Sequence, residues 1–211
     1  CLPNMIVSLI SFSYQTMPLV LLEKVTCLPE KQLALLQACV QDNKLDEAML
    51  LSTCNRVEWL IIGQSPQRVM TWLSGQLGMS QAVLMDHAHI VKDVAAVMHV
   101  MEVACGLQSM LVGEANILGQ LKQAWQQACQ AQTVGQYLHR LVPMVFSVAK
   151  KVRTQTNIGQ HAGSLAQLGV RLIKHIFAQT AKCHLLMIGA GALIDELAPQ
   201  LLQHSWVQVS F

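Results

Sequence analysis

The stretch AMLLSTCNRVEWLII, residues 48–62, decides much of the fold because two apolar runs flank one polar turn. Residues 48–51 and 59–62 are short and rich in Leu and Ile, which is typical of buried strands. The turn between them carries Cys54, with Thr53, Asn55 and Arg56 beside it. A cysteine placed only for packing would sit inside an apolar run. Because a nearby cation favours the thiolate, which attacks carbonyl groups, Cys54 is a candidate nucleophile. The alternative is a turn cysteine without a chemical role.

The composition indicates apolar surface that a partner domain or subunit covers. Hydrophobic residues make up 53% and charged residues 12% of the 211 residues, and the mean hydropathy is +0.39. These proportions are unusual for a soluble monomer. The apolar run at residues 5–12 is too short to cross a bilayer and has no basic leader, and no later run reaches the roughly 18 apolar residues required. We therefore expect no membrane span and a cytoplasmic location.

The cysteines and charges exclude several other classes of protein. The seven cysteines are odd in number, scattered and without a Cys-x-x-Cys pair, which indicates a reducing compartment and neither a disulfide framework nor a zinc cluster. The histidines have no spacing that predicts a metal site. A net charge of +2 does not indicate a nucleic-acid binder, and the basic cluster at residues 150–153 is typical of a solvated helix end.

The first half of the chain predicts a mixed α/β unit. Residues 5–12 are expected to form a strand, residues 29–41 a helix, and residues 66–78 a helix that stops near Gly78. Asp93 is expected to cap a helix over residues 94–110, with Gly106 in its interior.

Two further helices follow. The first starts at Gly113, and a second, over residues 134–154, should be kinked by Pro143. The buried stripe expected on the first consists of Ile117, Leu121, Ala124 and Ala128. A polar stripe on another face consists of Asn116, Gln120, Gln123 and Gln127. This second stripe is either solvated or lines a cleft.

After a linker at residues 156–164, the pattern changes. A helix over residues 165–178 precedes a buried strand at 185–188, a Gly189-Ala190-Gly191 turn, a helix at 193–202 and a strand from 207. Strand, Gly-x-Gly, helix and strand open a dinucleotide-binding unit, in which glycines let the backbone approach a pyrophosphate. Ile194 stands at the third glycine position of that motif. One and a half strands cannot close a Rossmann domain, so we expect a fragment of a longer protein.

Four segments, in order, resemble glutamyl-tRNA reductase, the NADPH-dependent enzyme that begins tetrapyrrole synthesis. The segments are LSTCNRVE (residues 51–58), GLQSMLVGE (106–114) running on to ILGQ (117–120), KVRTQTNIG (151–159) and IGAGALI (188–194). The resemblance implies an α/β fold: a mixed α+β catalytic domain with long helices, followed by the first part of a Rossmann-type nucleotide-binding domain. The corresponding boundaries are residues 1–158 for the glutamyl-tRNA-binding domain and 159–211 for the partial NADPH domain. Full-length members are expected to be homodimers through a C-terminal region absent here.

The resemblance also implies a chemistry and a set of site residues. Cys54 would attack the activated ester of glutamyl-tRNA and hold glutamate as a thioester, which NADPH would reduce to glutamate 1-semialdehyde. His99 corresponds to the histidine near the nucleophile, and Arg56 would bind the substrate γ-carboxylate. Further substrate contacts are implied for Thr53, Asn55, Ser109, Glu114, Ala115, Asn116 and Gln120. Those implied for the cofactor are Gly189, Ala190, Gly191, Ala192, Leu193 and Ile194.

One segment departs from the family pattern. Residues 11–18 read SFSYQTMP, where the family usually has Gly-x-Asn-His-Lys-Thr-Ala-Pro, so that Tyr14 and Gln15 replace a histidine and a lysine. Ala115-Asn116 replaces the usual Pro-Gln. The altered loop motivates an alternative, a diverged non-catalytic relative that binds tRNA or protein. A generic thiol acyl-transferase or hydrolase is a third interpretation, which the glycine turn at residue 189 disfavours.

Overall fold

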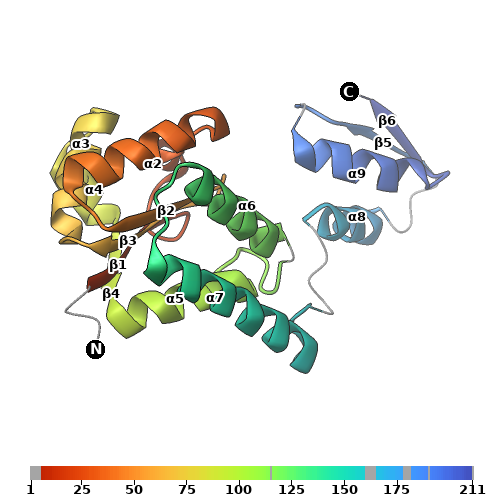
Figure 1. Cartoon of the computed structure of the whole chain (residues 1–211). Helices are drawn as coiled ribbons and strands as arrows, with labels where there is room; N and C mark the ends of the chain where they lie inside the picture. Colours follow the sequence, from red (N-terminus) through yellow and green to blue (C-terminus); the bar gives the residue numbers. More distant parts are fainter. Residues whose placement is uncertain (1–5, 115, 160–164, 178–181, 190, 211) are drawn as a thin grey trace.

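The computed structural model describes residues 6–114, 116–159, 165–177, 182–189 and 191–210. Its elements, in chain order, are β1 (Ile6–Ser13), α1 (Leu19–Val25), α2 (Pro29–Asn43), β2 (Glu47–Ser52), β3 (Arg56–Gly63), α3 (Pro66–Leu77), α4 (Gln81–His87), β4 (His89–Lys92), α5 (Asp93–Cys105), α6 (Asn116–Gln130), α7 (Gln136–Gln155), the 3₁₀ turn η1 (Asn157–Gly159), α8 (Leu165–Ile176), β5 (Cys183–Leu186), α9 (Ala192–Leu202) and β6 (Val207–Ser210). The mixed α/β class predicted from the sequence is confirmed (Figure 1).

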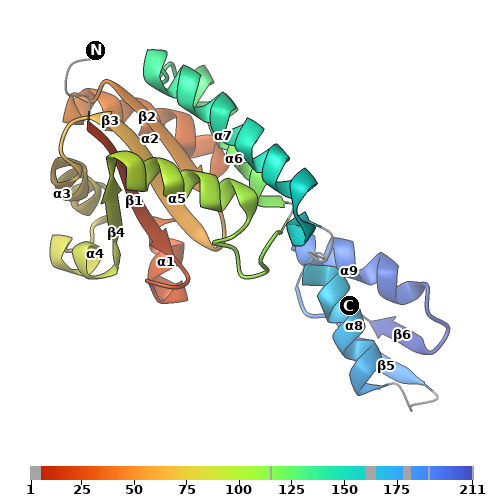
Figure 2. The same ribbon diagram turned by 90° about the horizontal axis from the view of Figure 1, so that it is seen from below.

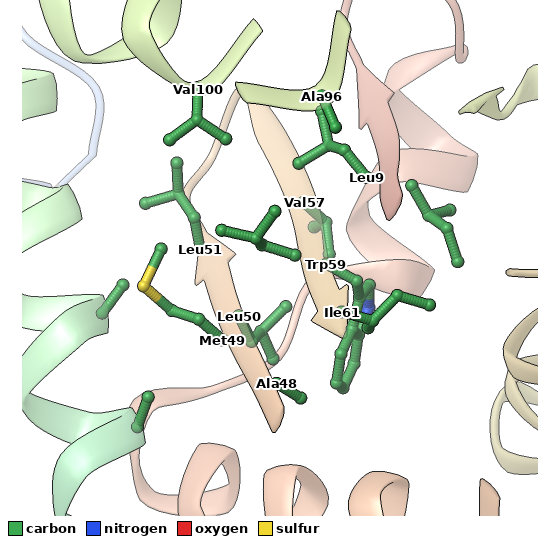
Figure 3. Close-up of a cluster of buried hydrophobic side chains, with 14 of the residues drawn as sticks. Leu9, Ala48, Met49, Leu50, Leu51, Val57, Trp59, Ile61, Ala96 and Val100 are labelled. Carbon is green, nitrogen blue, oxygen red and sulfur yellow. The ribbon is translucent and has the colours of Figure 1, made fainter. Parts of the chain in front are cut away.

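A four-stranded antiparallel sheet of order β2-β3-β1-β4 forms the centre of the first unit. Figures 1 and 2 show α2 and α3 on one face of this sheet and α5 on the other. Both faces of β2 and β3 are therefore buried, which explains why these strands appear in the sequence as continuous apolar runs. Figure 3 shows the core from within, where Ala96 and Val100 of α5 lie over the side chains of β1, β2 and β3.

Local sequence signals set most helix ends. Pro29 and Pro66 occupy the first positions of α2 and α3, and Ser65 caps α3 by accepting a hydrogen bond from the Gln67 N–H. Gly78 ends α3 in the left-handed conformation, as predicted. The buried stripe predicted for α6 is also confirmed, since its four apolar residues are all buried against β2 and neighbouring helices.

Several sequence predictions were wrong in detail. Gly106 does not lie inside a helix; it ends α5 with a φ of 79°, and Asp93 is the first helical residue and makes no side-chain capping bond. The polar turn around Cys54 is shorter than expected, because β3 already begins at Arg56. Helix α7 includes Pro143, and its buried residues are Leu138, Leu141, Val142, Val145 and Ala149.

A buried carboxylate holds the start of α7 against the sheet. Glu47 of β2 accepts hydrogen bonds from the backbone N–H groups of Tyr137 and Leu138 at 2.8 and 2.7 Å. These N–H groups belong to the first turn of α7, which has no capping side chain of its own. The helix that packs on α5 is therefore anchored by a residue from the edge strand.

The C-terminal elements form a second, smaller unit. Strands β5 and β6 pair in parallel, with α9 between them in sequence, and a separate cluster of buried residues joins them to α8. The strand predicted at residues 185–188 is found at Cys183–Leu186, but it is not fully buried: Leu186 and Ile188 are exposed. Among the described residues, no element covers the side chains of Leu186 and Ile188. No helix in the described ranges is long and apolar enough to cross a membrane.

Candidate active site

Cys54 lies at the tip of the β2–β3 hairpin and is exposed. The Thr53 N–H donates to the Arg56 carbonyl at 2.8 Å, and Thr53 Oγ1 accepts from the Asn55 and Arg56 N–H groups at 3.2 and 3.1 Å. The Tyr14 N–H donates to the Asn55 carbonyl at 3.0 Å and ties the turn to the end of β1. The Thr53 hydroxyl therefore shapes the turn, and the turn leaves the cysteine accessible.

The turn borders a small cavity of about 40 Å³. Residues from three separate segments line it: Thr53, Cys54, Asn55, Arg56, Ser109, Met110, Glu114, Ile117 and Gln120. Seven of these were predicted as site residues from the sequence. The other two, Met110 and Ile117, carry no polar group, and Ile117 was assigned only to the buried stripe of α6. The fold thus brings together the thiol, a guanidinium, a carboxylate and hydroxyl and amide groups.

Asn116 and His99, two further predicted site residues of this domain, do not line the Cys54 cavity. Asn116 is the exposed first residue of α6. Ala115 lies outside the described residues. His99 of α5 lines a neighbouring cavity of about 260 Å³ together with His89, Gln108 and residues of the altered loop at 11–18. Arg56 lines both cavities and so connects them.

A buried network around Glu58 holds three residues that line the larger of these two cavities: Ser11, Arg56 and His99. Glu58 Oε1 accepts hydrogen bonds from Arg56 Nη1 at 2.9 Å, His99 Nε2 at 3.0 Å and Ser11 Oγ at 3.0 Å. The side chains of Arg56 and Glu58 are only 3% and 4% exposed. The sequence did not reveal this network, because its members come from β1, β3 and α5 and its hydrogen bonds join residues up to 47 positions apart.

Burial and partners act in opposite directions on Glu58. Burial by itself raises the pKa of this carboxyl, because it disfavours the charged form. The hydrogen bond from His99, the positive charge of Arg56, the charge of His99 and the hydrogen bond from Ser11 together outweigh burial and hold the pKa below its usual range. Glu58 is therefore a carboxylate at neutral pH, and it fixes the positions of Arg56 and His99.

Arg56 is bound mainly to protein groups. Besides Glu58, its Nη2 donates to the Gln108 backbone carbonyl. These contacts involve two of the five N–H donors of a guanidinium, so capacity for a carboxylate ligand remains. Arg56 is thus held in place by Glu58 and by the loop after α5, and its side chain lines both cavities.

The loop after α5 carries Ser109 and Glu114 to the cavity and is held at both ends. The Gly113 N–H donates to the Gly106 carbonyl at 2.9 Å, and a Cβ added at Gly106 would lie 3.0–3.1 Å from backbone atoms of Glu114 and Gly113. Arg153 Nη2 of α7 donates to the carbonyls of Gly113, at 3.1 Å, and of Glu114. Glycine at position 106 therefore permits the close approach that closes the loop over the cavity.

The other cysteines in the described ranges occupy less accessible surroundings than Cys54. Burial raises the pKa of the Cys39 thiol to about 12, and it also raises the pKa values of Cys27, Cys105 and Cys129. Among the described cysteines, Cys54 is the one classed as exposed. Access therefore distinguishes the predicted nucleophile from the cysteines that serve packing.

The predicted nucleotide turn lies between β5 and α9. Gly189 has a φ of 129°, a conformation that L side chains rarely adopt, and Gly191 directly precedes the first residue of α9. Ala192, Leu193 and Ile194 form the first turn of α9, and Ala190 lies outside the described residues. The N-terminus of a helix offers backbone N–H donors to a phosphate group, so the residues at the start of α9 suit the phosphates of a dinucleotide.

Fold and site together define a class of protein: a mixed α/β domain that presents an accessible cysteine beside a polar cavity, joined to a parallel β-α-β unit. A sequence model of the glutamyl-tRNAGlu reductase N-terminal domain matches residues 10–156. The chain belongs to the glutamyl-tRNA reductase family.

Individual relatives agree with this assignment. The chain is 40% identical over 197 residues to glutamyl-tRNA reductase of Pseudoalteromonas translucida, covering 92% of this chain and 47% of the relative. It is 39% identical over 183 residues to the Coxiella burnetii reductase, covering 87% and 44%. The solved glutamyl-tRNA reductase from Methanopyrus kandleri matches with a TM-score of 0.66 and 26% identity, covering 96% of this chain and 48% of that one. The chain thus spans about half the length of the relatives it matches.

Proposed function

We propose that this chain carries the thiol chemistry of a glutamyl-tRNA reductase, with residues 1–158 as the catalytic, tRNA-binding domain and residues 159–211 as the start of the NADPH-binding domain. The observation that supports this most is the exposed Cys54 beside a cavity that also contains Arg56, Ser109, Glu114 and Gln120. The proposed reaction of the full-length protein is the reduction of glutamyl-tRNA to glutamate 1-semialdehyde, the first step of tetrapyrrole synthesis.

In the first step, the Cys54 thiolate attacks the ester carbonyl carbon of glutamyl-tRNA. A C–S bond forms, the C–O bond to the terminal ribose breaks, and the ribose oxygen leaves with a proton. Arg56 supplies positive charge near the sulfur, and its remaining donors bind the γ-carboxylate. His99, held by Glu58 at 3.0 Å, is the candidate for exchanging the proton.

The remaining polar residues position the glutamyl group. Glu114 is suited to the substrate's ammonium group, because opposite charges attract and its carboxylate accepts hydrogen bonds. Asn55, Ser109, Asn116 and Gln120 offer neutral donors and acceptors, and Thr53 keeps the turn in shape.

The turn between β5 and α9 is the proposed site for NADPH, with Gly189 and Gly191 near the pyrophosphate and Ala190, Ala192, Leu193 and Ile194 completing it. When bound, this cofactor supplies the hydride that converts the thioester to the aldehyde. We further propose that the full-length protein is cytoplasmic and forms a homodimer.

Label transfer tests the proposed function. The chain is mixed with glutamyl-tRNA labelled in glutamate, and protein-bound label is measured after denaturation at mildly acidic pH, which preserves thioesters. We expect label on the wild type and none above background on Cys54→Ser, while Cys129→Ser behaves like the wild type. Absence of an adduct, or an adduct that survives in Cys54→Ser, contradicts the proposal.

A second candidate function is non-catalytic binding of tRNA or protein. It is favoured by the altered loop at residues 11–18, since Gln15 lines the cavity with Arg56 and His99, and its amide donates to the Tyr14 hydroxyl at 3.0 Å. This candidate predicts tight glutamyl-tRNA binding by the full-length protein without acylation of Cys54. Restoring the family residues with Tyr14→His and Gln15→Lys should then create the missing acylation.

A further inference from the structure

A third cleft, of about 420 Å³, lies between the start of α2, the end of β2 and one face of α6. Its lining is unusual in being dominated by carboxamide side chains: Gln32, Gln120, Gln123, Gln126, Gln127 and Gln130. Pro29, Leu51 and Ala124 add apolar surface. No charged side chain is among the lining residues in the described part of the chain.

Helix geometry explains why the glutamines gather there. Gln120, Gln123 and Gln127 are spaced at i, i+3 and i+7 and therefore share one face of α6. This face lies next to the buried stripe that packs on β2, so these residues line the groove between α6 and α2. From the other side, Gln32 is 4% exposed and is held by a hydrogen bond from its Nε2 to the Cys27 carbonyl at 3.2 Å.

The cleft adjoins the Cys54 cavity. Gln120 lines both, and Ser52 of the cleft is followed directly by Thr53 and Cys54 of the cavity. The Cys54 cavity, at about 40 Å³, is too small to hold a nucleoside as well as the acyl group. An ester that reaches Cys54 must therefore extend its leaving group beyond this cavity, and the amide-lined cleft is directly adjacent.

The side chains that line the cleft indicate what kind of ligand it binds. Uncharged amides next to apolar surface suit a flat heterocycle with hydrogen-bonding edges, and the volume lies in the range of about 300–1,000 Å³ typical of small-molecule sites. A glutamine amide pairs with adenine through two hydrogen bonds, to its N6 and N7 atoms. We propose that this cleft binds the 3′-terminal adenosine of the tRNA, whose ribose carries the ester that Cys54 attacks. This inference rests on the proposed function for the identity of the tRNA, but its binding test does not require acylation.

The binding test uses two RNA trinucleotides, CCA and CCU, and the full 211-residue chain. Affinity and side-chain amide shifts are followed by nuclear magnetic resonance. We expect CCA to shift the Gln123 and Gln127 amide signals and to bind about 10-fold more tightly than CCU, as one bidentate base contact allows. The double variant Gln123→Met/Gln127→Met should lose this preference, because Met keeps the length but not the hydrogen bonds. The control Gln76→Met, on the exposed side of α3, should keep it.

Equal affinity for CCA and CCU, or a preference that survives in the double variant, overturns the inference. Adenosine 2′,5′-bisphosphate, which resembles the adenosine half of NADPH, tests whether the cleft binds the adenosine of the cofactor and not that of the tRNA. If it occupies the cleft more tightly than CCA and shifts the same glutamine signals, the cleft belongs to the dinucleotide and the inference fails. If it leaves those signals unchanged, the assignment to RNA is supported.

Acylation rates separate this inference from the proposed function. We expect the ratio of the rate with glutamyl-tRNA to the rate with glutamate ethyl ester to fall about 10-fold in the double variant and to stay constant in Gln76→Met. An unchanged ratio, with normal acylation of Cys54, overturns the cleft assignment and leaves the function intact. Preferential CCA binding at the cleft without acylation of Cys54 supports the assignment and contradicts the function.

Discussion

Cys54 and Glu58 are four residues apart, yet the chain places them in opposite surroundings. Cys54 is exposed at a hairpin tip, whereas Glu58 is 4% exposed and is bound by three donors at 2.9–3.0 Å. The comparison separates two requirements of a thiol site. The sulfur needs access to its substrate, and the charges around it need fixed positions, which burial and hydrogen bonds provide. Arg56, between them in sequence, belongs to both regions.

Alkylation of native protein gives the largest expected contrast, because it tests access directly. We expect iodoacetamide to modify Cys54 rapidly and to leave Cys39 unmodified over the same period. Cys39 is fully buried, and with a pKa of about 12 only about one in ten thousand of its thiols is ionised at pH 8. Peptide mass mapping measures both rates in one sample. Comparable alkylation rates for Cys54 and Cys39 in folded protein would show that the two thiols do not differ in accessibility.

The second contrast concerns the buried network. Glu58→Gln leaves the Arg56 guanidinium buried without its counter-charge, so we expect the free energy of unfolding to fall by about 3–5 kcal/mol. Glu47→Gln is the matched control, since Glu47 is equally buried but accepts only backbone N–H groups; its expected cost is about 1–3 kcal/mol. Cys54→Ser, at the exposed tip, should change stability by less than about 0.5 kcal/mol. Urea unfolding measures all three, and equal losses for Glu58→Gln and Glu47→Gln would contradict a special role for the ion pair.

The fold was predictable where one segment dictates its own structure. The spacing of Ile117, Leu121, Ala124 and Ala128 predicted the buried face of α6 because helical periodicity is local. Gly106 was misplaced because a glycine within an apolar, helix-forming stretch looks the same in sequence whether it sits inside the helix or ends it. Strand β4 was missed, since two half-buried residues between two exposed ones give no alternation, and their pairing with β1 is a tertiary contact.

The same limit applies to the site. Seven of the nine residues that line the Cys54 cavity were predicted because they lie within short motifs that resemble a known family. The bonds from Ser11 and His99 to Glu58 were not found, since they join residues 47 and 41 positions apart. The commitment of Arg56 to Glu58 and to the Gln108 carbonyl likewise depends on packing that no local pattern encodes.

The loop after α5 joins the two regions, because it gives Ser109 to the cavity and the Gln108 carbonyl to Arg56. Gly106→Ala should destabilise the protein by about 1–2 kcal/mol, since alanine disfavours the φ of 79° found there. It should also slow acylation of Cys54, because the added Cβ pushes on the backbone of Glu114. Gly75→Ala is the control: it lies inside α3 with open space around it and should stabilise by about 0.5–1 kcal/mol. A Gly106→Ala protein as stable and reactive as the wild type would show that the loop adapts freely.

The smallest expected effect is the pH dependence that Glu58 contributes. A carboxyl whose pKa is lower in the folded protein than in the unfolded chain stabilises the fold at pH values above the unfolded pKa, near about 4.3. That contribution is lost as the pH falls through the lower, folded pKa. The stability difference between wild type and Glu58→Gln should therefore be largest at neutral pH and shrink below about pH 4. Urea unfolding from pH 7 to pH 3 measures it, with Cys54→Ser expected to follow the wild-type curve throughout. A stability difference that stays constant over this range would mean that Glu58 does not ionise as its three donors require. Cys54 and Glu58 would then differ in exposure but not in charge.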